Sequence, residues 1–174
     1  MATNKKIRVA ILAGGTSSEK DISLLTAKNI IENLDKNTYE IKQVIIDEEK
    51  KWRVGHYRKK PKQALQNIDV VVNALHGEYG EDGEVQAVLD KLGVPYTGSG
   101  PLSSALAMDK ISSRHLFKQN GLLVPDTLNF EFNKILDFKA VQNEIAGYFN
   151  FPVVIKPNAK GSSIGVSIVK EPAD

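Results

Sequence analysis

The 174-residue sequence contains no cysteine. This absence excludes disulfide bonds, zinc–thiolate sites and cysteine nucleophiles, and it is consistent with a reducing compartment. The chain also has no large excess of charge, because 23 Lys and Arg residues balance 21 Asp and Glu residues. Nothing therefore indicates a nucleic-acid partner. Neither a signal peptide nor an apolar run long enough to span a membrane is visible, so we expect no membrane partner.

Short apolar runs typical of strands recur along the chain. Residues 7–13 and 69–75 are largely apolar, which favours strands buried on both faces of a parallel sheet. Residues 39–47 begin with alternating apolar positions, and residues 94–100 supply a short strand that ends in a glycine–serine turn. Helical segments separate these runs, so the sequence predicts an α/β fold with a parallel sheet.

The first strand is followed by a turn of small residues, 14–18, and then by a helix. Ser18 and Asp21 have the spacing of a capping box at the helix start. The turn matches neither the dinucleotide-binding Gly-x-Gly-x-x-Gly pattern nor the Walker loop, so both kinds of site are disfavoured. Glu19 lies at the first turn, where it either complements the helix dipole or faces the ammonium group of a ligand. The apolar face of the helix is predicted to contain Leu24, Ala27, Ile31 and Leu34.

The most informative stretch is residues 76–86, which follows a predicted strand and precedes a second amphipathic helix. Ligands of open α/β sheets bind at the carboxyl ends of strands, so His76 is predicted to line a site. The alternative is structural, with a packed histidine and with Glu84 as a cap of the helix amino terminus. Three glycines allow positive φ angles and a close approach of a ligand to the backbone, namely Gly77, Gly80 and Gly83.

The segments around these motifs are less distinctive. Residues 48–62 are charged and are expected to be irregular, with Trp52 and Tyr57 as possible anchors on the domain. Residues 101–119 predict one long helix that opens with a proline. Residues 138–149 predict a weaker helix.

The last informative stretch is a predicted hairpin. Residues 151–157 and 166–169 form its strands, and a tip rich in glycine and serine, residues 158–165, joins them. The amide and hydroxyl groups of such a tip are good phosphate donors, and Lys156 lies beside it. The alternative is a flexible hairpin with a solvated lysine.

Five motifs resemble the D-alanine–D-alanine ligase family, a branch of the ATP-grasp superfamily. Each motif is weak alone, but in this order and spacing they are highly specific, and they span nearly the whole chain. They are Ala13-Gly-Gly-Thr-Ser-Ser-Glu19 with Ile22-Ser23, His76-Gly-x-x-Gly-Glu-Asp-Gly-x-x-Gln86, Pro95-Tyr-Thr-Gly-Ser-Gly100, Ala105-Leu-Ala-Met-Asp-Lys110, and Val154-Ile-Lys-Pro157 followed by Gly161-Ser-Ser-Ile-Gly165.

The resemblance implies a parallel-sheet amino-terminal α/β domain, residues 1–104, followed by part of a central ATP-grasp α+β subdomain, residues 105–174. It also implies a cytoplasmic, homodimeric ligase of peptidoglycan synthesis that uses ATP and Mg²⁺. In this family ATP phosphorylates the carboxylate of one D-alanine. The amine of a second D-alanine then attacks the acyl phosphate to give D-alanyl-D-alanine.

The resemblance further implies roles for individual residues. Glu19 contacts the ammonium group of the first D-alanine, Ser162 is its hydrogen-bonded companion, and His76 lines the substrate and acyl-phosphate region. Lys110 and Lys156 bind the ATP phosphates. The flap that closes on the γ-phosphate contains the cofactor-binding positions Gly161, Ser162, Ser163 and Gly165, whereas Lys160 departs from the family pattern.

The family's magnesium ligands, adenine pocket and second-substrate arginine lie beyond the position that matches Asp174. We therefore expect the chain to be the amino-terminal portion of a ligase, without metal ligands and inactive alone. Two alternatives stay open, a noncatalytic ligand-binding fragment and an ATP-grasp ligase for a different acid and amine, such as D-alanine and D-lactate. Glu19 and His76 favour the D-alanine branch, because they belong to the amino-acid side of the family site.

Overall fold

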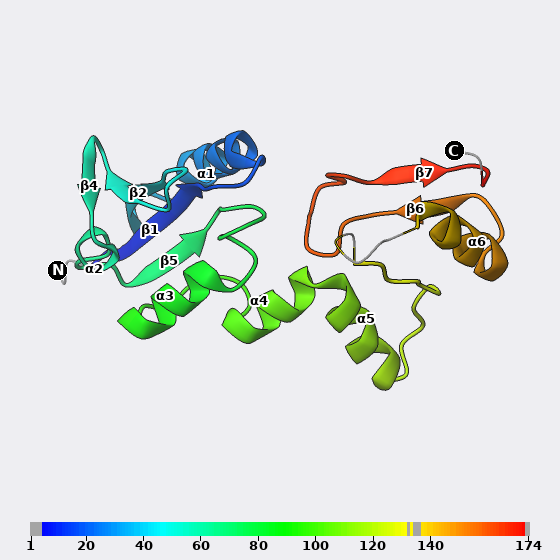
Figure 1. The fold of residues 1–174 in the computed structure, drawn as a ribbon. Coiled ribbons are helices and arrows are strands. Elements are labelled where there is room, and N and C mark those ends of the chain that lie inside the picture. Colours follow the sequence, from blue (N-terminus) through cyan, green and yellow to red (C-terminus); the bar gives the residue numbers. More distant parts are fainter. Residues whose placement is uncertain (1–4, 132, 134–136, 173–174) are drawn as a thin grey trace. The chain divides into compact units, whose positions relative to one another are not determined.

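The computed structural model of the chain describes residues 5–131, 133 and 137–172. The chain divides into two compact units, Met1–Ala107 and Met108–Asp174. Each unit has its own sheet, which Figure 1 shows with the elements labelled. Among the described residues, no helix is both long and apolar enough to cross a membrane.

The first unit contains a five-stranded sheet in the order β4-β3-β2-β1-β5. β1 (Ile7–Gly14) pairs in parallel with β2 (Tyr39–Ile46) along its whole length and with β5 (Val70–Asn73) on its other edge. These three strands confirm the predicted parallel α/β arrangement. β3 (Trp52–Val54) and β4 (Tyr57–Lys59) extend the sheet in antiparallel fashion.

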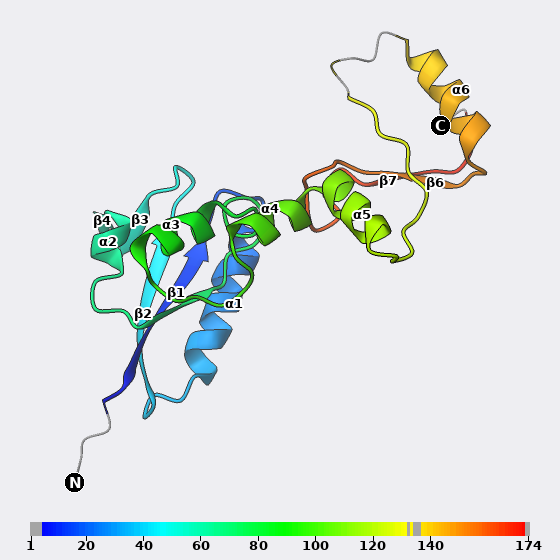
Figure 2. The same ribbon diagram turned by 90° about the horizontal axis from the view of Figure 1, so that it is seen from below.

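Helices cover both faces of this sheet (Figure 2). α1 (Lys20–Asn33) packs on one face, where Ala27 meets the alternate β1 residues Val9, Ile11 and Ala13. α2 (Pro61–Ala64) and α3 (Glu84–Leu92) pack on the other face against residues that include Leu12 and Val71. A strand flanked in this way is apolar at nearly every position, which is why the β1 and β5 runs were recognisable from sequence.

The segment 48–62 is ordered, so its prediction as irregular was wrong. It contains β3, β4 and the start of α2. Trp52 anchors it with 2% of its surface exposed, whereas Tyr57 is 73% exposed and is not an anchor. The polar side chains of this hairpin edge face solvent, and Arg58 pairs with Asp47 at 3.2 Å. The charged composition therefore reflects an exposed sheet edge and not a loop.

Two further expectations for the first unit were wrong. Residues 94–100 form no strand beyond a single parallel bridge between Val71 and Tyr96, because Pro95 has no N–H to extend a ladder. The helix after β1 starts at Lys20 with Glu19 at the cap position and no side-chain cap bond, so Ser18 and Asp21 form no capping box. Instead, Ser17 Oγ accepts a hydrogen bond from the Glu19 amide at 3.2 Å.

The predicted long helix over 101–119 is two helices. α4 (Pro101–Met108) ends before Asp109, whose backbone is extended at φ −81° and ψ 105°. α5 (Lys110–Gln119) then begins with the Asp109 side chain as its cap, accepting from the Ser112 amide at 2.7 Å. A well-capped new start stabilises this break in an otherwise continuous helical pattern.

The second unit confirms the predicted weaker helix and the hairpin. α6 (Phe138–Tyr148) precedes β6 (Val153–Ile155), which pairs antiparallel with β7 (Ser167–Val169). The strands are short, with three residues each, so much of the connecting segment belongs to the tip. The tip is therefore a long irregular segment between two short strands.

Candidate functional site

Two loops of the first unit meet at the carboxyl edge of the sheet. They follow β1 and β5, which are adjacent and parallel, so their carboxyl ends lie side by side. Ser23 of α1 joins them, because its buried hydroxyl accepts from the Gly14 amide at 2.9 Å and donates to the Ala74 carbonyl at 2.8 Å. The position predicted for a ligand site is thus built from both loops.

Glu19 and His76 are brought to the same corner of the first unit. Ser17 Oγ donates to the His76 carbonyl at 2.6 Å, which ties the two loops directly. Gly77 has φ +68°, and a Cβ placed there would lie 3.0 Å from Glu19 Oε2. The glycine is required at this point because the Glu19 carboxylate packs against the loop backbone. Glu19 is partly buried, as a residue that binds a ligand cation should be.

The imidazole of His76 has a partner on each nitrogen. Nε2 lies 3.1 Å from Thr26 Oγ1 of α1, and Nδ1 lies 3.4 Å from Glu81 Oε1. The side chain of His76 is 31% exposed, so the ring is held by the protein yet reachable by a small molecule.

The start of α3 is capped by Asp82, one of the three acidic residues that the sequence places there, and not by Glu84. Asp82 accepts from the Tyr79 amide at 2.7 Å and from the Glu84 amide at 3.0 Å. Glu84 makes no side-chain cap bond and pairs instead with Lys50 at 2.5 Å. The expectation that Glu84 caps the helix was therefore wrong, although its charge still lies in the first turn.

The remainder of the His76 loop is fixed by buried polar contacts. The Gly80 carbonyl accepts from both Asn73 Nδ2 and Gln86 Nε2, each at 2.8 Å. Tyr79 is 5% exposed with φ +68°, and its hydroxyl accepts from Trp52 Nε1 at 3.0 Å. Burial raises the pKa of the Tyr79 phenol, so it stays a neutral hydrogen-bonding group. These contacts make the loop a preformed structure.

In the second unit, Lys110 lies against the base of the glycine-rich tip. Its ammonium donates to the carbonyls of Asn158 at 3.0 Å and Lys160 at 2.6 Å. The Asn158 side chain donates to Asp109 Oδ2 at 2.6 Å and accepts from the Ile111 amide at 2.9 Å. Hydrogen bonds from the Ser112 amide and then from Asn158 hold the pKa of Asp109 below its usual value, so it remains ionised as their acceptor.

The tip of the hairpin has few contacts and an unusual backbone. Ser162 and Ser163 have φ values of +50° and +60°, in the left-handed region that non-glycine residues rarely adopt. Both are exposed. Two turn bonds hold the tip, from the Ile164 amide to Gly161 O at 3.0 Å and from the Val166 amide to Ser163 O at 3.2 Å. Such consecutive left-handed residues turn backbone N–H groups toward one side, which suits an anion.

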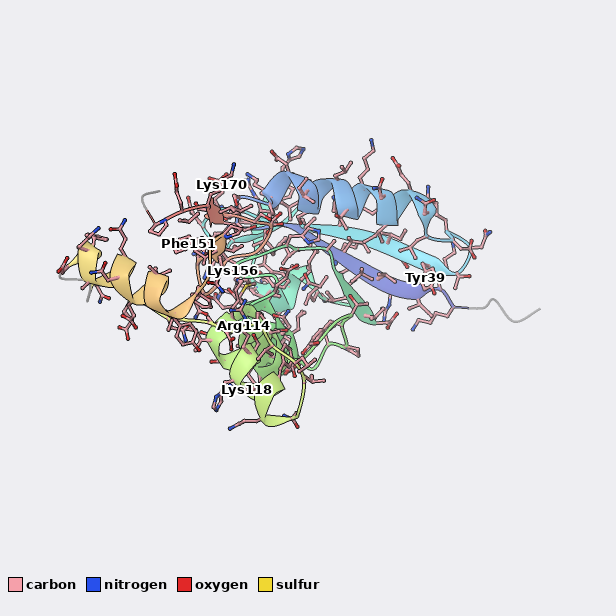
Figure 3. All side chains as sticks on the ribbon, turned by 90° about the vertical axis from the view of Figure 1, so that its right-hand side faces the viewer. Tyr39, Arg114, Lys118, Phe151, Lys156 and Lys170 are labelled. Atoms are coloured by element: carbon pink, nitrogen blue, oxygen red, sulfur yellow. The ribbon has the colours of Figure 1, made fainter. Side chains whose placement is uncertain are left out.

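Lys156 directly follows β6 and is exposed (Figure 3). It makes no hydrogen bond or ion pair with any part of the chain that the structure describes. Arg114 and Lys118 lie on α5, and Arg114 donates to Thr127 Oγ1 at 2.7 Å. A cation without a protein partner, located beside a loop of exposed amides, remains available to a phosphate group.

Sequence reasoning missed four residues that hold these groups. Ser17, Thr26, Asp109 and Asn158 all contact or orient a predicted site residue. For Thr26, the available signal was its spacing of seven positions from Glu19, which is the same helical face. For Asp109, the signal was a serine three positions later, the spacing of an amino-terminal cap.

Comparison with known families identifies both parts of the chain. The model described as "D-ala D-ala ligase N-terminus" matches residues 8–66 and 56–99. The model described as "D-ala D-ala ligase C-terminus" matches residues 116–174. A curated D-alanine–D-alanine ligase from Clostridium beijerinckii is 42% identical over 165 residues, which is 95% of this chain and 50% of that protein. The chain spans about half the length of the curated relatives it matches.

Solved structures give the same result. The D-alanine–D-alanine ligase from Bacillus anthracis, complexed with ATP, aligns with a TM-score of 0.72 and 37% identity, over 95% of this chain and 50% of that one. The VanG D-Ala:D-Ser ligase from Enterococcus faecalis aligns with a TM-score of 0.76 and 28% identity, over 96% and 56%. The folding pattern, both family models and the sequence identity agree, and the chain belongs to the D-alanine–D-alanine ligase family.

Proposed function

We propose that this chain supplies the first amino-acid site and part of the ATP site of a ligase that joins two D-alanines into D-alanyl-D-alanine for peptidoglycan. The observation that carries the proposal is the corner where Glu19 and His76 meet. A partly buried carboxylate and an imidazole with two partners lie there on a preformed loop. Such a corner suits a small zwitterion, because its ammonium group pairs with the carboxylate in a partly desolvated place.

On the amino-acid side, Glu19 binds the ammonium group of the first D-alanine. His76 lines the same region, and its ring faces the carboxylate that reacts. Ser162 is the proposed hydrogen-bonding companion of Glu19 in the closed enzyme. Together these groups orient the first substrate before any chemistry takes place.

On the phosphate side, Lys110 and Lys156 bind the ATP phosphates. The ammonium of Lys110 already donates to two carbonyls of the tip, and its third N–H remains for a phosphate oxygen. The exposed amides and hydroxyls of the tip, at Gly161, Ser162, Ser163 and Gly165, cover the γ-phosphate. Fixed cations and N–H donors stabilise the charge that develops during phosphoryl transfer.

The reaction then needs two displacements. A carboxylate oxygen of the first D-alanine attacks the γ-phosphorus, and ADP leaves with the electrons of the broken P–O bond. The amine of the second D-alanine attacks the acyl carbon, loses a proton, and expels phosphate. Excluding water from the acyl phosphate protects it from hydrolysis between the steps.

Magnesium is implied by the family, but the described residues do not fit it. Among them, no group of three or more His, Cys, Asp and Glu side chains is placed to hold a metal ion. Magnesium in phosphoryl-transfer sites usually takes one or two protein carboxylates in addition to the phosphates. We therefore assign no metal ligand to residues 5–131, 133 and 137–172. We also propose that the ligase acts in the cytoplasm and forms a homodimer.

The test compares the 174-residue chain with the protein that is encoded by the complete reading frame containing it, here called the reading-frame product. Each is incubated with Mg-ATP and D-alanine, and both phosphate release and D-alanyl-D-alanine are measured. We expect D-alanine-dependent release from the reading-frame product and none from the chain alone, because the residues that the structure describes include no carboxylate cluster for magnesium. A reading-frame product that stays inactive would contradict the ligase assignment. Sustained release by the chain alone would contradict the division of the site.

A second candidate keeps the same first half-reaction but uses another second substrate. The alignment with a D-Ala:D-Ser ligase favours including this alternative. The same assay with D-serine or D-lactate added to limiting D-alanine distinguishes them by the mass of the product. If D-alanyl-D-serine or D-alanyl-D-lactate were the main product, the second substrate would be D-serine or D-lactate and not D-alanine.

A further inference from the structure

One face of α1 is aligned with the loop after β5. Glu19, Ser23 and Thr26 are spaced at i, i+4 and i+7, which places them on one side of the helix. Ser23 donates to the Ala74 carbonyl, and Thr26 contacts His76. Ser23 and Thr26, about one turn apart on α1, thus contact Ala74 and His76 of the loop after β5. The helix therefore fixes the position of this loop.

The two contacts of the His76 ring differ in strength. The distance from Nε2 to Thr26 Oγ1 is 3.1 Å, well within hydrogen-bond range. The distance from Nδ1 to Glu81 Oε1 is 3.4 Å, close to the outer limit, and the Glu81 side chain is 48% exposed. The Thr26 contact is the firmer one, and the Glu81 contact is the one that a ligand can replace.

The chemistry of the partners selects one form of the ring. An ionised carboxylate only accepts hydrogen bonds, so the contact with Glu81 requires a proton on Nδ1. In the neutral ring, Nε2 is then the acceptor of the Thr26 hydroxyl. A hydroxyl both donates and accepts, so Thr26 can hold Nε2 whether or not that nitrogen carries a proton.

We propose that Thr26 is a positioning residue for His76. Its hydroxyl fixes Nε2 to α1 and, by donating to Nε2 while the Glu81 carboxylate accepts from Nδ1, favours the ring form with the proton on Nδ1. The ring then presents an Nδ1–H donor to the carboxylate of the bound amino acid. The part that concerns the amino acid rests on the proposed function. The part that concerns the ring tautomer stands on the contacts alone.

The first experiment reads the tautomer directly in the 174-residue chain. His56 and His115 are exposed and are replaced by Gln, which leaves His76 as the single histidine. The ¹⁵N shifts of the ring nitrogens are then measured at a pH where the ring is neutral, in the Thr26 protein and in Thr26→Val, Thr26→Ala and Thr26→Ser. Valine keeps the shape of threonine without the hydroxyl, and serine keeps the hydroxyl.

We expect the Nδ1–H form in the Thr26 and Ser proteins. We expect a mixed population or the Nε2–H form in the Val protein, with the Ala protein as a second hydroxyl-free variant should valine disturb folding. Ser23→Ala is the matched control on the same helix face, and it should lower the melting temperature without changing the His76 shifts. Unchanged His76 shifts in both hydroxyl-free variants would overturn the proposal.

The second experiment uses the complete reading-frame product. One hydrogen bond is worth up to about 1.5 kcal/mol, so Thr26→Val should raise the KM for the first D-alanine by about tenfold, with the KM for ATP unchanged. Thr26→Ser should restore it. Equal effects on both substrates would overturn the positioning role. An unmodified protein without D-alanine-dependent activity would refute the proposed function, and the tautomer measurement would still decide the role of Thr26.

Discussion

Residues 76–83 of the first unit and residues 158–165 of the second are both glycine-containing loops that follow a strand, but they are held in different ways. In the first loop, Tyr79 is buried and the Gly80 carbonyl accepts two side-chain hydrogen bonds. In the second, Asn158 and Lys110 fix the base, whereas the tip has two backbone turn bonds and its serines are exposed.

The difference matches the ligands we assign to each loop. A small amino acid makes few contacts with its site, so the site must be ordered before the ligand binds. The conformational entropy of the loop is then lost when the protein folds and not when the amino acid binds. A triphosphate offers many charged oxygens, so a loop that binds it can be ordered by the ligand itself. We therefore expect the first loop to be a preformed site and the second to be a flap that phosphate orders.

The largest expected effect comes from removing a charge beside the second loop. In the reading-frame product, Lys156→Met should lower kcat/KM for ATP on the order of 100-fold, because a phosphate contact in a dry site is worth about 2–3 kcal/mol. Lys118→Met on α5 is the matched control and should leave the kinetics unchanged. Wild-type kinetics in the Lys156 variant would remove this lysine from the site.

The next effect concerns the stability of the first loop. Gly83 has φ +96°, and a Cβ there would overlap the Pro101 carbonyl oxygen. Gly83→Ala should therefore lower the free energy of unfolding by about 2 kcal/mol or more, measured by denaturant unfolding of the 174-residue chain. Gly93→Ala has a similar φ of +66° with no neighbour within 4 Å, so its loss should be smaller, about 1 kcal/mol.

The same measurement on the second loop can break the comparison. At Gly165 a Cβ would lie 2.8 Å from Pro157 Cγ, in a region with few other contacts. Gly165→Ala should cost less stability than Gly83→Ala, because an exposed tip can shift. An equal or larger loss would mean that the tip is as firmly built as the His76 loop.

A smaller effect separates the two roles that the sequence allowed for Glu19. Glu19→Gln should weaken the binding of the first D-alanine about tenfold and leave the KM for ATP unchanged, because only the charge opposite the ammonium is lost. Asp21→Asn removes a charge from the same first turn of α1 and is the control for the helix dipole. Equal losses in the two variants would favour the dipole explanation.

The parts of the fold that could be predicted are those with a simple physical signal. β1 and β5 are buried on both faces, so their apolar runs were clear, and α3 ends at Gly93 in the left-handed conformation that its glycine predicts. The β3–β4 hairpin was missed because its β4 side chains are exposed and only Trp52 and Val54 of β3 pack on the core. The break at Asp109 was missed because the helical periodicity continues across it.

The candidate site divides in the same way. Glu19, His76, Lys110 and Lys156 have chemistry that stands out in the sequence. The residues that orient them do not, because Thr26 and Asn158 are ordinary polar residues whose role depends on contacts 50 and 47 positions away. Periodicity and motif spacing carry no information about such long-range pairs.

Amide hydrogen exchange in the ligand-free 174-residue chain tests the central contrast most directly. Two bonded amides are compared in or beside each loop. Glu81 and Val85 donate to the Gly77 and Tyr79 carbonyls, and Ile164 and Val166 donate to the Gly161 and Ser163 carbonyls. We predict that Glu81 and Val85 exchange slowly and that Ile164 and Val166 exchange at least about tenfold faster, because the tip can open without unfolding its unit. Equal protection of the two pairs would contradict the view that loop 76–83 is preformed and that loop 158–165 becomes ordered only when phosphate binds.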